Sequence, residues 1–302
     1  MRALLLYLAR REGFKHFMLK FEVFRKLAWR FVAGETLDDA MRVVTEANRQ
    51  AVRGTLDLLG ENTVSLDDAR GATREIIRIL DRIRSEHVDC NVSVKPTQLG
   101  LNLGREHCLG NLSSIVAHAR QLGNFVRVDM EDSGYTDKTL DVVRRVHAEM
   151  DNVGAVIQSY LYRSENDARV LVKEGIRIRL CKGAYLEPDT VAFRKKADTD
   201  ASFMRIMKLL LDSGLYHAIA THDEAIIAAT REYSESRRIP RDGFEFQLLY
   251  GIRRDLQQEL ARDGYNVRIY IPYGGRWYPY LMRRLAERPA NLVFMVRNIF
   301  RG

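Results

Sequence analysis

The sequence predicts an α/β protein folded as a (β/α)8 barrel. From about residue 50 onward, short apolar runs alternate with amphipathic segments, a rhythm typical of parallel strands joined by right-handed helical crossovers. Eight such units over about 250 residues match the usual size of this barrel. An open doubly wound sheet is the alternative, but no Gly-x-Gly-x-x-Gly fingerprint opens any of the predicted helices. The composition, with 46% hydrophobic and 29% charged residues in a chain of 302, is ordinary for a globular protein.

Each predicted strand is a short apolar run. The first is the least regular, because Gly54 and Asp57 interrupt it, and a ninth run at 292–296 is interpreted as a terminal annex to the barrel. The eight strands are expected at 53–59, 91–95, 125–129, 154–160, 176–181, 217–221, 244–250 and 267–271. Helical periodicity predicts the intervening helices at 66–84, 111–122, 138–150, 166–174, 190–211, 223–235 and 255–262.

Most of the net charge of +8 lies near the N-terminus. Residues 1–33 contain eight basic and two acidic residues, and apolar residues recur among them at the spacing of an amphipathic helix. Such an arm either packs on the main domain or a partner subunit, or lies on anionic lipid. Nucleic acid is not expected as a partner, because the rest of the chain is nearly neutral and carries no recognised binding motif. We therefore expect a helical arm over 1–48 and a barrel over 49–302.

Several chemistries lack the residues that they need. Cys90, Cys108 and Cys181 form no CxxC pair, which argues against a disulfide framework or a zinc site and favours the cytoplasm. The seven histidines form no HExxH motif, so no metal site is predicted, and no G-x-S-x-G elbow indicates a serine hydrolase. The N-terminal apolar run is too short for a signal peptide, and no stretch approaches the roughly 18 apolar residues of a membrane span.

Polar side chains gather where the predicted strands end. Loops are polar for trivial reasons too, but active sites of (β/α)8 barrels lie at the carboxyl ends of the strands, and the set as a whole favours one site there. Its members are Asp57, Glu61, Lys95, Asp129, Glu131, Gln158, Tyr160, Arg179, Lys182, Thr221, His222, Gln247, Tyr250, Tyr270 and Tyr273.

The segment after the last strand favours a small ligand with a carboxylate and a ring. On a helix, one face would carry Tyr280, Arg283, Arg284 and Glu287. Two guanidinium groups can each bind a carboxylate in a bidentate manner, and a phenol ring one turn earlier supplies a flat wall. A solvated face with Glu–Arg pairs is the alternative, although five aromatic residues between positions 270 and 280 are hard to reconcile with full exposure.

Several spaced blocks resemble the proline dehydrogenase family, the flavin enzymes that oxidise L-proline to Δ1-pyrroline-5-carboxylate. The resemblance covers roughly residues 50–300 and implies FAD as the cofactor and a distorted (β/α)8 barrel whose final helix lies over the mouth. The blocks are Leu-Asp-Leu-Leu-Gly-Glu at 56–61, Val-Ser-Val-Lys at 92–95, Val-Asp-Met-Glu at 128–131, Arg-Leu-Cys-Lys-Gly-Ala-Tyr at 179–185, Ala-Thr-His at 220–222, Arg-Ile-Tyr at 268–270 and Tyr-Leu-Met-Arg-Arg at 280–284.

The resemblance implies roles for single residues. The expected catalytic residues are Lys95, Asp129 and Arg179. The substrate-binding positions are matched by Lys95, Tyr185, Tyr270, Tyr280 and the arginine pair Arg283 and Arg284. The cofactor-binding positions are matched by Gln158, Arg179, Lys182, Gly183, Ala184, Thr221, His222 and Glu287. The tyrosine at position 270 further implies that proline is preferred over 4-hydroxyproline.

The implied reaction suits these residue types. Hydride transfer from the carbon beside the substrate nitrogen to flavin N5 requires the two to be held in register, and nearby cations favour a neutral nitrogen. The resemblance also implies membrane quinone as electron acceptor and a separate pyrroline-5-carboxylate dehydrogenase that receives the product. The basic segment 1–33 would then hold the barrel near lipid, as a peripheral membrane contact. Two alternatives remain open: a Schiff-base lyase or aldolase using Lys95 or Lys182, and a non-catalytic barrel bound to nucleic acid or membrane through its arm.

Overall fold

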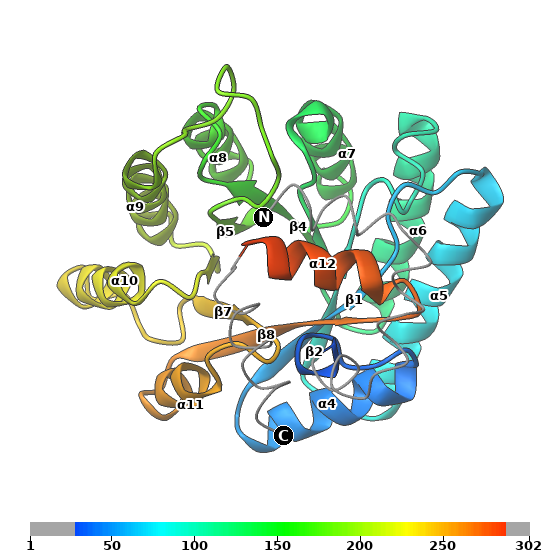
Figure 1. Cartoon of the computed structure of the whole chain (residues 1–302), viewed down its shortest axis with the longest axis horizontal. Coiled ribbons are helices and arrows are strands. Elements are labelled where there is room, and N and C mark those ends of the chain that lie inside the picture. The colour runs from blue at the N-terminus through cyan, green and yellow to red at the C-terminus, as the bar shows by residue number, and fades with distance from the viewer. Residues whose placement is uncertain (1–27, 288–302) are drawn as a thin grey trace, which may run out of the picture.

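The computed structural model describes residues 28–287, with side chains as far as Met282. Eight parallel strands close into a barrel in chain order, and β8 pairs with β1 (Figure 1). The predicted (β/α)8 barrel is therefore confirmed, with each strand within about two residues of its expected position. The strands are β1 (Arg53–Leu58), β2 (Cys90–Val94), β3 (Val126–Val128), β4 (Val153–Gln158), β5 (Arg177–Cys181), β6 (Ala218–Ala220), β7 (Glu245–Leu249) and β8 (Asn266–Tyr273). Residues 1–27 of the predicted arm and the run at 292–296 lie outside the described residues.

Helices follow the first seven strands and surround the barrel (Figure 1). They are α5 (Leu66–Ser85), α6 (Arg105–Gln121), α7 (Thr136–His147) after the 3-10 turn η1 (Ser133–Tyr135), α8 (Ser164–Lys173), α9 (Lys196–Asp212), α10 (Glu224–Ser236) and α11 (Arg254–Arg262). Two predicted starts are wrong. Helix α6 begins earlier than expected, because Gly110 lies on its exposed face and does not interrupt it. Helix α9 begins later, because the preceding residues form a loop that is hydrogen-bonded to the segment after β4.

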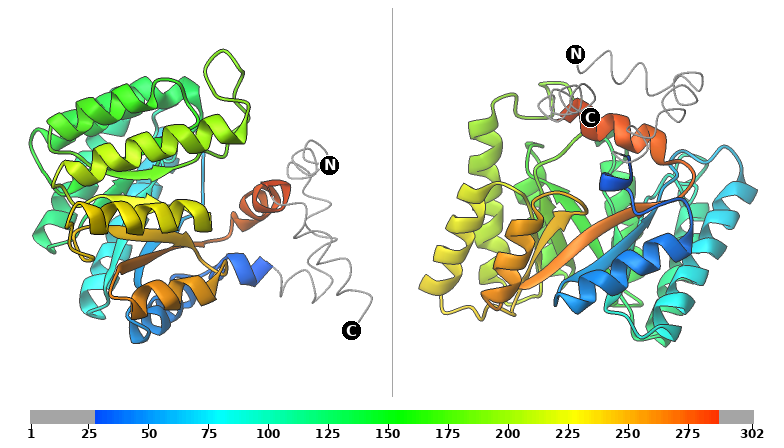
Figure 2. Two further views of the ribbon diagram at one scale, coloured as in Figure 1. Left: turned by 90° about the vertical axis from the view of Figure 1, so that its left-hand side faces the viewer. Right: turned by 60° about the horizontal axis from the view of Figure 1, so that its bottom comes forward.

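The helix after β8 does not join this ring. Helix α12 (Trp277–Glu287) crosses the mouth of the barrel instead, as the resemblance implied (Figures 1 and 2). The place beside β8 and β1 is taken by α4 (Leu37–Arg49), which packs on both strands through Ala40, Met41, Val44 and Ala47. Thr36 caps the start of α4 by accepting a hydrogen bond from the backbone of Asp39 at 3.2 Å. No helix within residues 28–287 is long and apolar enough to cross a membrane.

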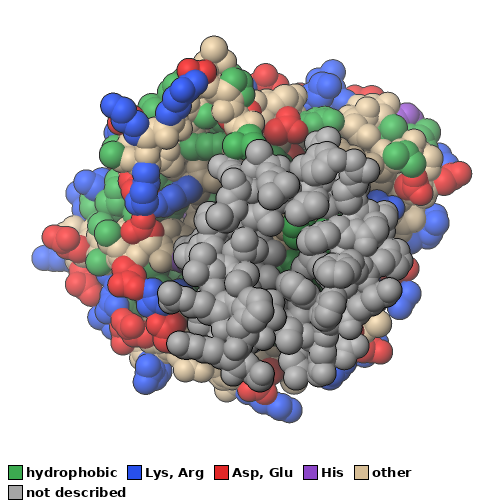
Figure 3. All heavy atoms as spheres, in the orientation of Figure 1, with side chains coloured by type: hydrophobic (Ala, Val, Ile, Leu, Met, Phe, Trp, Pro, Cys, Tyr) green, Lys and Arg blue, Asp and Glu red, His purple; other side chains and the backbone are tan. Residues whose placement is uncertain are grey.

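Neighbouring helices of the ring are joined by ion pairs on their exposed faces. Arg145 of α7 pairs with Glu106 of α6 at 2.7 Å, and Arg205 of α9 pairs with Glu165 of α8 at 2.9 Å. Figure 3 shows acidic and basic side chains interspersed around the rim of the face that carries α12. Because exposed pairs contribute at most about 1 kcal/mol each, the ring is held mainly by the apolar core between helices and strands.

The inside of the barrel is polar and has two layers near the mouth. Alternate residues of a strand face the same side, so the inward-facing side chains form layers. In the deeper layer, the buried Nε group of Arg268 donates to the two carboxylate oxygens of Glu245 at 3.1 and 3.0 Å. Arg127, also buried there, donates to the backbone oxygens of Ala155 at 3.0 Å and Arg177 at 2.6 Å. The next layer forms the base of the mouth. Its inward-facing side chains come two residues later in the chain, and they are Asp129, Gln247 and Tyr270.

Gly154 on β4 leaves room for the deeper layer. A Cβ atom at this position would lie 2.4 Å from the backbone oxygen of Arg177 and 2.5 Å from Nη1 of Arg127. These distances are far below van der Waals contact, and a backbone oxygen in a barrel cannot move aside cheaply. The absence of a side chain here is therefore a requirement of the fold.

We predict that Gly154→Ala lowers the free energy of unfolding by about 1–3 kcal/mol, the usual cost of overpacking. Gly110→Ala is the matched control, because a Cβ atom added to Gly110 in α6 would meet nothing within 4 Å, and it should stabilise by about 0.5–1 kcal/mol through helix propensity. Urea unfolding followed by circular dichroism measures both. Shifts of the same sign in the two variants would contradict this account of Gly154.

Candidate active site

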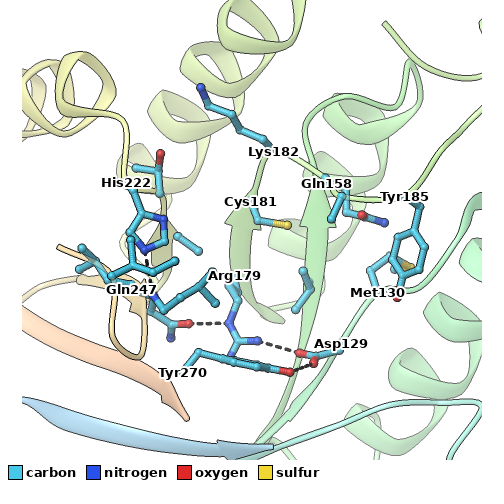
Figure 4. A pocket seen from close by; sticks show the side chains of 18 of the residues that line it. Asp129, Met130, Gln158, Arg179, Cys181, Lys182, Tyr185, His222, Gln247 and Tyr270 are labelled. Atoms are coloured by element: carbon cyan, nitrogen blue, oxygen red, sulfur yellow. Dashed lines mark hydrogen bonds and ion pairs between the residues drawn. The ribbon is translucent and has the colours of Figure 1, made fainter. Parts of the chain in front are cut away.

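A cavity of about 660 Å³ lies at the carboxyl ends of the strands, where α12 crosses the barrel (Figure 1), and Figure 4 shows side chains that line it. Twelve of the fifteen predicted site residues line it: Lys95, Asp129, Gln158, Arg179, Lys182, Gly183, Ala184, Tyr185, Thr221, His222, Tyr270 and Tyr280. The other three, Arg283, Arg284 and Glu287, belong to α12, but their side chains lie outside the described part of the chain. The structure thus brings together the predicted residues that it describes, and the arginine pair stays a prediction.

Asp129, just after β3, is the centre of a hydrogen-bond network at the base of the cavity (Figure 4). Its Oδ1 atom accepts from Nη1 of Arg179 at 2.7 Å and from the hydroxyl of Ser93 at 2.7 Å. Its Oδ2 atom accepts from the hydroxyl of Tyr270 at 2.7 Å. Burial opposes ionisation, but Lys95 and Arg179 outweigh it and lower the pKa of Asp129. Asp129 is therefore a carboxylate that orients the cationic and phenolic groups around it.

Lys95, just after β2, joins this network from the other side. Its Nζ atom lies 2.5 Å from Oδ1 of Asp57, 3.1 Å from the hydroxyl of Tyr270 and 3.5 Å from Oδ2 of Asp129. Burial disfavours the charged ammonium, but the two carboxylates overcome this effect and raise the pKa of Lys95. Lys95 is therefore a buried cation with fixed partners.

Arg179 on β5 places a second cation at the base of the cavity. Its Nε group donates to Gln247 at 2.5 Å, and Nη1 donates to Ser93 at 3.0 Å as well as to Asp129. Its buried Nη2 group finds no hydrogen-bond partner among the described residues. A buried donor without an acceptor is costly, so this group suits an acceptor atom of a bound molecule.

The side of the cavity formed by β5 and β6 is held by charges of both signs. Lys182 lies 2.5 Å from Asp200 of α9 and 2.8 Å from Asp223, which also caps α10. The Nε2 atom of His222 accepts from the backbone of Leu249 at 2.9 Å, so a neutral His222 ring carries its hydrogen on Nδ1. These contacts fix the two side chains at the ends of their strands.

Glu131 is a buried carboxyl group beside the base of the cavity. It accepts from the backbone of Thr97 at 2.8 Å and from the hydroxyl of Thr97 at 2.5 Å, and its backbone oxygen accepts from Gln158 at 2.8 Å. Burial raises the pKa of Glu131 to about 7. The loops after β2 and β3 are thereby joined through one titratable group.

Sequence reasoning gave no site role to three residues that complete the network: Asp57, Ser93 and Gln247. Asp57 and Gln247 stood among the strand-end residues, and their place in the inward-facing register of β1 and β7 was the available signal. Ser93 lies two residues before Lys95 and faces the same side of β2. Lys196 and Asp223 also line the cavity, and nothing in their local sequence distinguishes them from surface charges.

Comparisons with a family model, with curated proteins and with solved structures all point to the same family. The family model described as proline dehydrogenase matches residues 40–297. Proline dehydrogenase 1 of Bacillus subtilis is 42% identical over 91% of this chain and 91% of its own length, and proline dehydrogenase of Deinococcus radiodurans is 42% identical with the same coverage. Among solved structures, proline utilization A of Bdellovibrio bacteriovorus, inactivated by N-propargylglycine, superposes with a TM-score of 0.82 at 27% identity. That match covers 87% of this chain, which spans only 32% of the larger protein.

The raised pKa of Glu131 predicts how stability varies with pH. Because its pKa rises from 4.5 to about 7 on folding, the folded state binds more protons between these values, and stability is lost as the pH rises through this window. The loss from this group is on the order of 3 kcal/mol. The free energy of unfolding of Glu131→Gln should therefore fall less between pH 5 and 8 than that of the wild type. Urea titrations at each pH measure it, with exposed Glu149→Gln as the control; parallel curves for the wild type and Glu131→Gln would refute the assignment.

Proposed function

The chain belongs to the proline dehydrogenase family, and from this premise we propose that it oxidises L-proline to Δ1-pyrroline-5-carboxylate with FAD and passes the electrons to quinone. The observation that carries the proposal is the base of the cavity, where Asp129 fixes the cations Lys95 and Arg179. These groups supply a fixed electrostatic field and no nucleophile. Such an arrangement suits hydride transfer to a bound cofactor, whose own chemistry does the redox step.

The donor set of the cavity fits FAD. Arg179 offers a buried N–H group that lacks a protein acceptor among the described residues, and its charge would stabilise negative charge that develops on reduction. The residues that would hold FAD are Gln158, Arg179, Lys182, Gly183, Ala184, Thr221, His222 and Glu287. When bound, the flavin supplies the acceptor for a hydride.

The substrate side of the cavity is proposed to bind a small cyclic imino acid. Arg283 and Arg284 would bind its carboxylate, and Tyr185, Tyr270 and Tyr280 would enclose its ring. The Tyr270 ring is held in place by hydrogen bonds of its hydroxyl with Asp129 at 2.7 Å and Lys95 at 3.1 Å. The family resemblance implies that a tyrosine at this position leaves little room for an added hydroxyl group, and on this ground we propose a preference for proline over 4-hydroxyproline. The charge of Lys95 would favour the neutral form of the substrate nitrogen.

The alternative chemistry of a Schiff-base lysine is disfavoured at Lys95. A lysine that attacks a carbonyl must first lose its proton. Burial alone would assist this loss, but Asp57 and Asp129 raise the pKa of Lys95. Lys95 is therefore suited to stabilising negative charge as an ammonium group, and not to attacking a carbonyl.

The proposal extends to three partners besides the substrate and the cofactor. Quinone in the membrane would accept the electrons, the basic segment 1–33 would hold the barrel near anionic lipid, and a separate pyrroline-5-carboxylate dehydrogenase would take the product. The support for membrane contact is the concentration of positive charge in this segment. Sedimentation with anionic vesicles, with and without residues 1–33, tests it; equal binding by both chains would remove the idea.

We expect the purified protein to show flavin absorbance that is bleached by L-proline without oxygen. The control is treatment with borohydride and a carbonyl substrate, which should trap no adduct on Lys95 or Lys182. A colourless protein that takes up no FAD, or one whose flavin proline does not reduce, would overturn the proposed function. A borohydride-trapped adduct would favour the lyase instead.

We expect Arg283→Ala and Arg284→Ala each to weaken substrate interaction by about 1.5–3 kcal/mol, the usual value for a hydrogen bond to a charged group. Flavin content should be unchanged. Arg276→Ala is the matched control, because Arg276 is exposed and lies directly before the same helix. Titration of flavin bleaching with proline gives the affinity, and unchanged affinity in both arginine variants would exclude the carboxylate clamp.

A further inference from the structure

The loop between β5 and α9 is anchored at both ends to Tyr160. The backbone N–H of Tyr160 donates to the oxygen of Lys182 at 3.0 Å, and the oxygen of Tyr160 accepts from the N–H of Phe193 at 2.8 Å. The two ends of loop 182–193 therefore meet at one residue, as in a compact Ω-type loop. The loop carries four residues of the cavity wall: Lys182, Gly183, Ala184 and Tyr185.

The start of the loop lies directly on the ring of Tyr160. A Cβ atom on Gly183 would be 2.3 Å from two carbons of that ring, and Gly183 has a φ of +111°, so only glycine fits here. The hydroxyl group of Tyr160 is also hydrogen-bonded to the backbone of Tyr185. The second half of the loop is held separately, since the N–H of Tyr162 donates to the oxygen of Val191 at 3.0 Å.

Glu187 ties the tip of the loop to the loop after β3. One carboxylate oxygen accepts from the backbone N–H of Ser133 at 2.7 Å, and the other accepts from the hydroxyl of Ser133. The first oxygen also lies 3.5 Å from the hydroxyl of Tyr160. Hydrogen bonds to a carboxylate are roughly twice as strong as neutral ones. Glu187 thus joins two loops that both line the cavity, one through Tyr185 and the other through Asp129 and Met130.

Apolar packing contributes little at this tip. Leu186, between Tyr185 and Glu187, is 66% exposed, and Pro188 and Asp189 are exposed as well. The position of the tip therefore depends on polar contacts, and Glu187 supplies two of them, both with Ser133.

We propose that Glu187 is a positioning residue that fixes Tyr185 on the substrate side of the cavity before the substrate binds. The inference rests on the proposed function, because it assigns Tyr185 to the proline ring. If the Tyr185 side of the cavity is already ordered, the free energy of substrate binding does not include the entropic cost of ordering it. Loss of the hydrogen bonds between Glu187 and Ser133 should therefore weaken substrate binding more than it slows the chemical step.

The test compares three variants of the full-length, flavin-loaded protein. Glu187→Ala removes both bonds to Ser133. Glu187→Gln keeps their shape, because its amide oxygen accepts from the backbone N–H and its amide nitrogen can face the hydroxyl. Asp189→Ala is the control, since it removes a carboxylate from the same loop whose partner, Arg194 at 2.6 Å, is mostly exposed. The measurements are KM and kcat for proline with a soluble dye, and amide hydrogen exchange of residues 182–187.

We expect Glu187→Ala to raise KM about tenfold, the effect of losing a charge-assisted bond, with a smaller change in kcat and faster exchange in 182–187. Glu187→Gln should recover most of KM, and Asp189→Ala should stay within about twofold of the wild type. If KM in Glu187→Ala matches that in Asp189→Ala, the positioning role is wrong, even if the melting temperature falls. If the wild type neither binds flavin nor oxidises proline, the proposed function fails, and exchange in 182–187 still decides whether Glu187 holds the loop.

Discussion

The arrangement of the cavity depends on burying two cations and two anions together. A single buried charge would be strongly unfavourable, but Asp57, Lys95, Asp129 and Arg179 each have a partner of opposite sign. This mutual requirement fixes their positions more strictly than apolar packing would, because loss of one charge leaves another uncompensated. The polar layer beneath, centred on the Arg268–Glu245 pair, supports the base of the cavity in the same way.

Much of the fold follows from local sequence. The strands of a (β/α)8 barrel are covered on the outside by helices, so they appear as short apolar runs at a regular spacing, and all eight were found near their expected places. The meeting of Lys95, Asp129 and Arg179 in one cavity was predictable to a similar extent, because strand direction alone sends them to one end of the barrel. The family blocks then separated these residues from ordinary polar loop residues.

What remained unpredictable depends on contacts between distant residues. Asp57 and Lys95 are 38 positions apart, and Ser133 and Glu187 are 54 apart, so no local pattern reports either pair. The start of α9 was misjudged for the same reason: the residues from 190 onward continue the helical periodicity, but hydrogen bonds of their loop to Tyr160 and Tyr162 hold them outside the helix. The start of α6 was misjudged in the opposite sense: Gly110 lies directly before the expected start, but an exposed glycine weakens a helix without ending it.

The displacement of α12 from the outer ring separates two kinds of constraint along the chain. The barrel wall is complete without this helix, because α4 covers β8 and β1 in its stead. Substitutions in α12 can therefore change which small molecules enter the cavity while the barrel wall stays folded. Natural selection on substrate range and natural selection on folding can thus act on different segments, a modularity that favours functional divergence within one architecture.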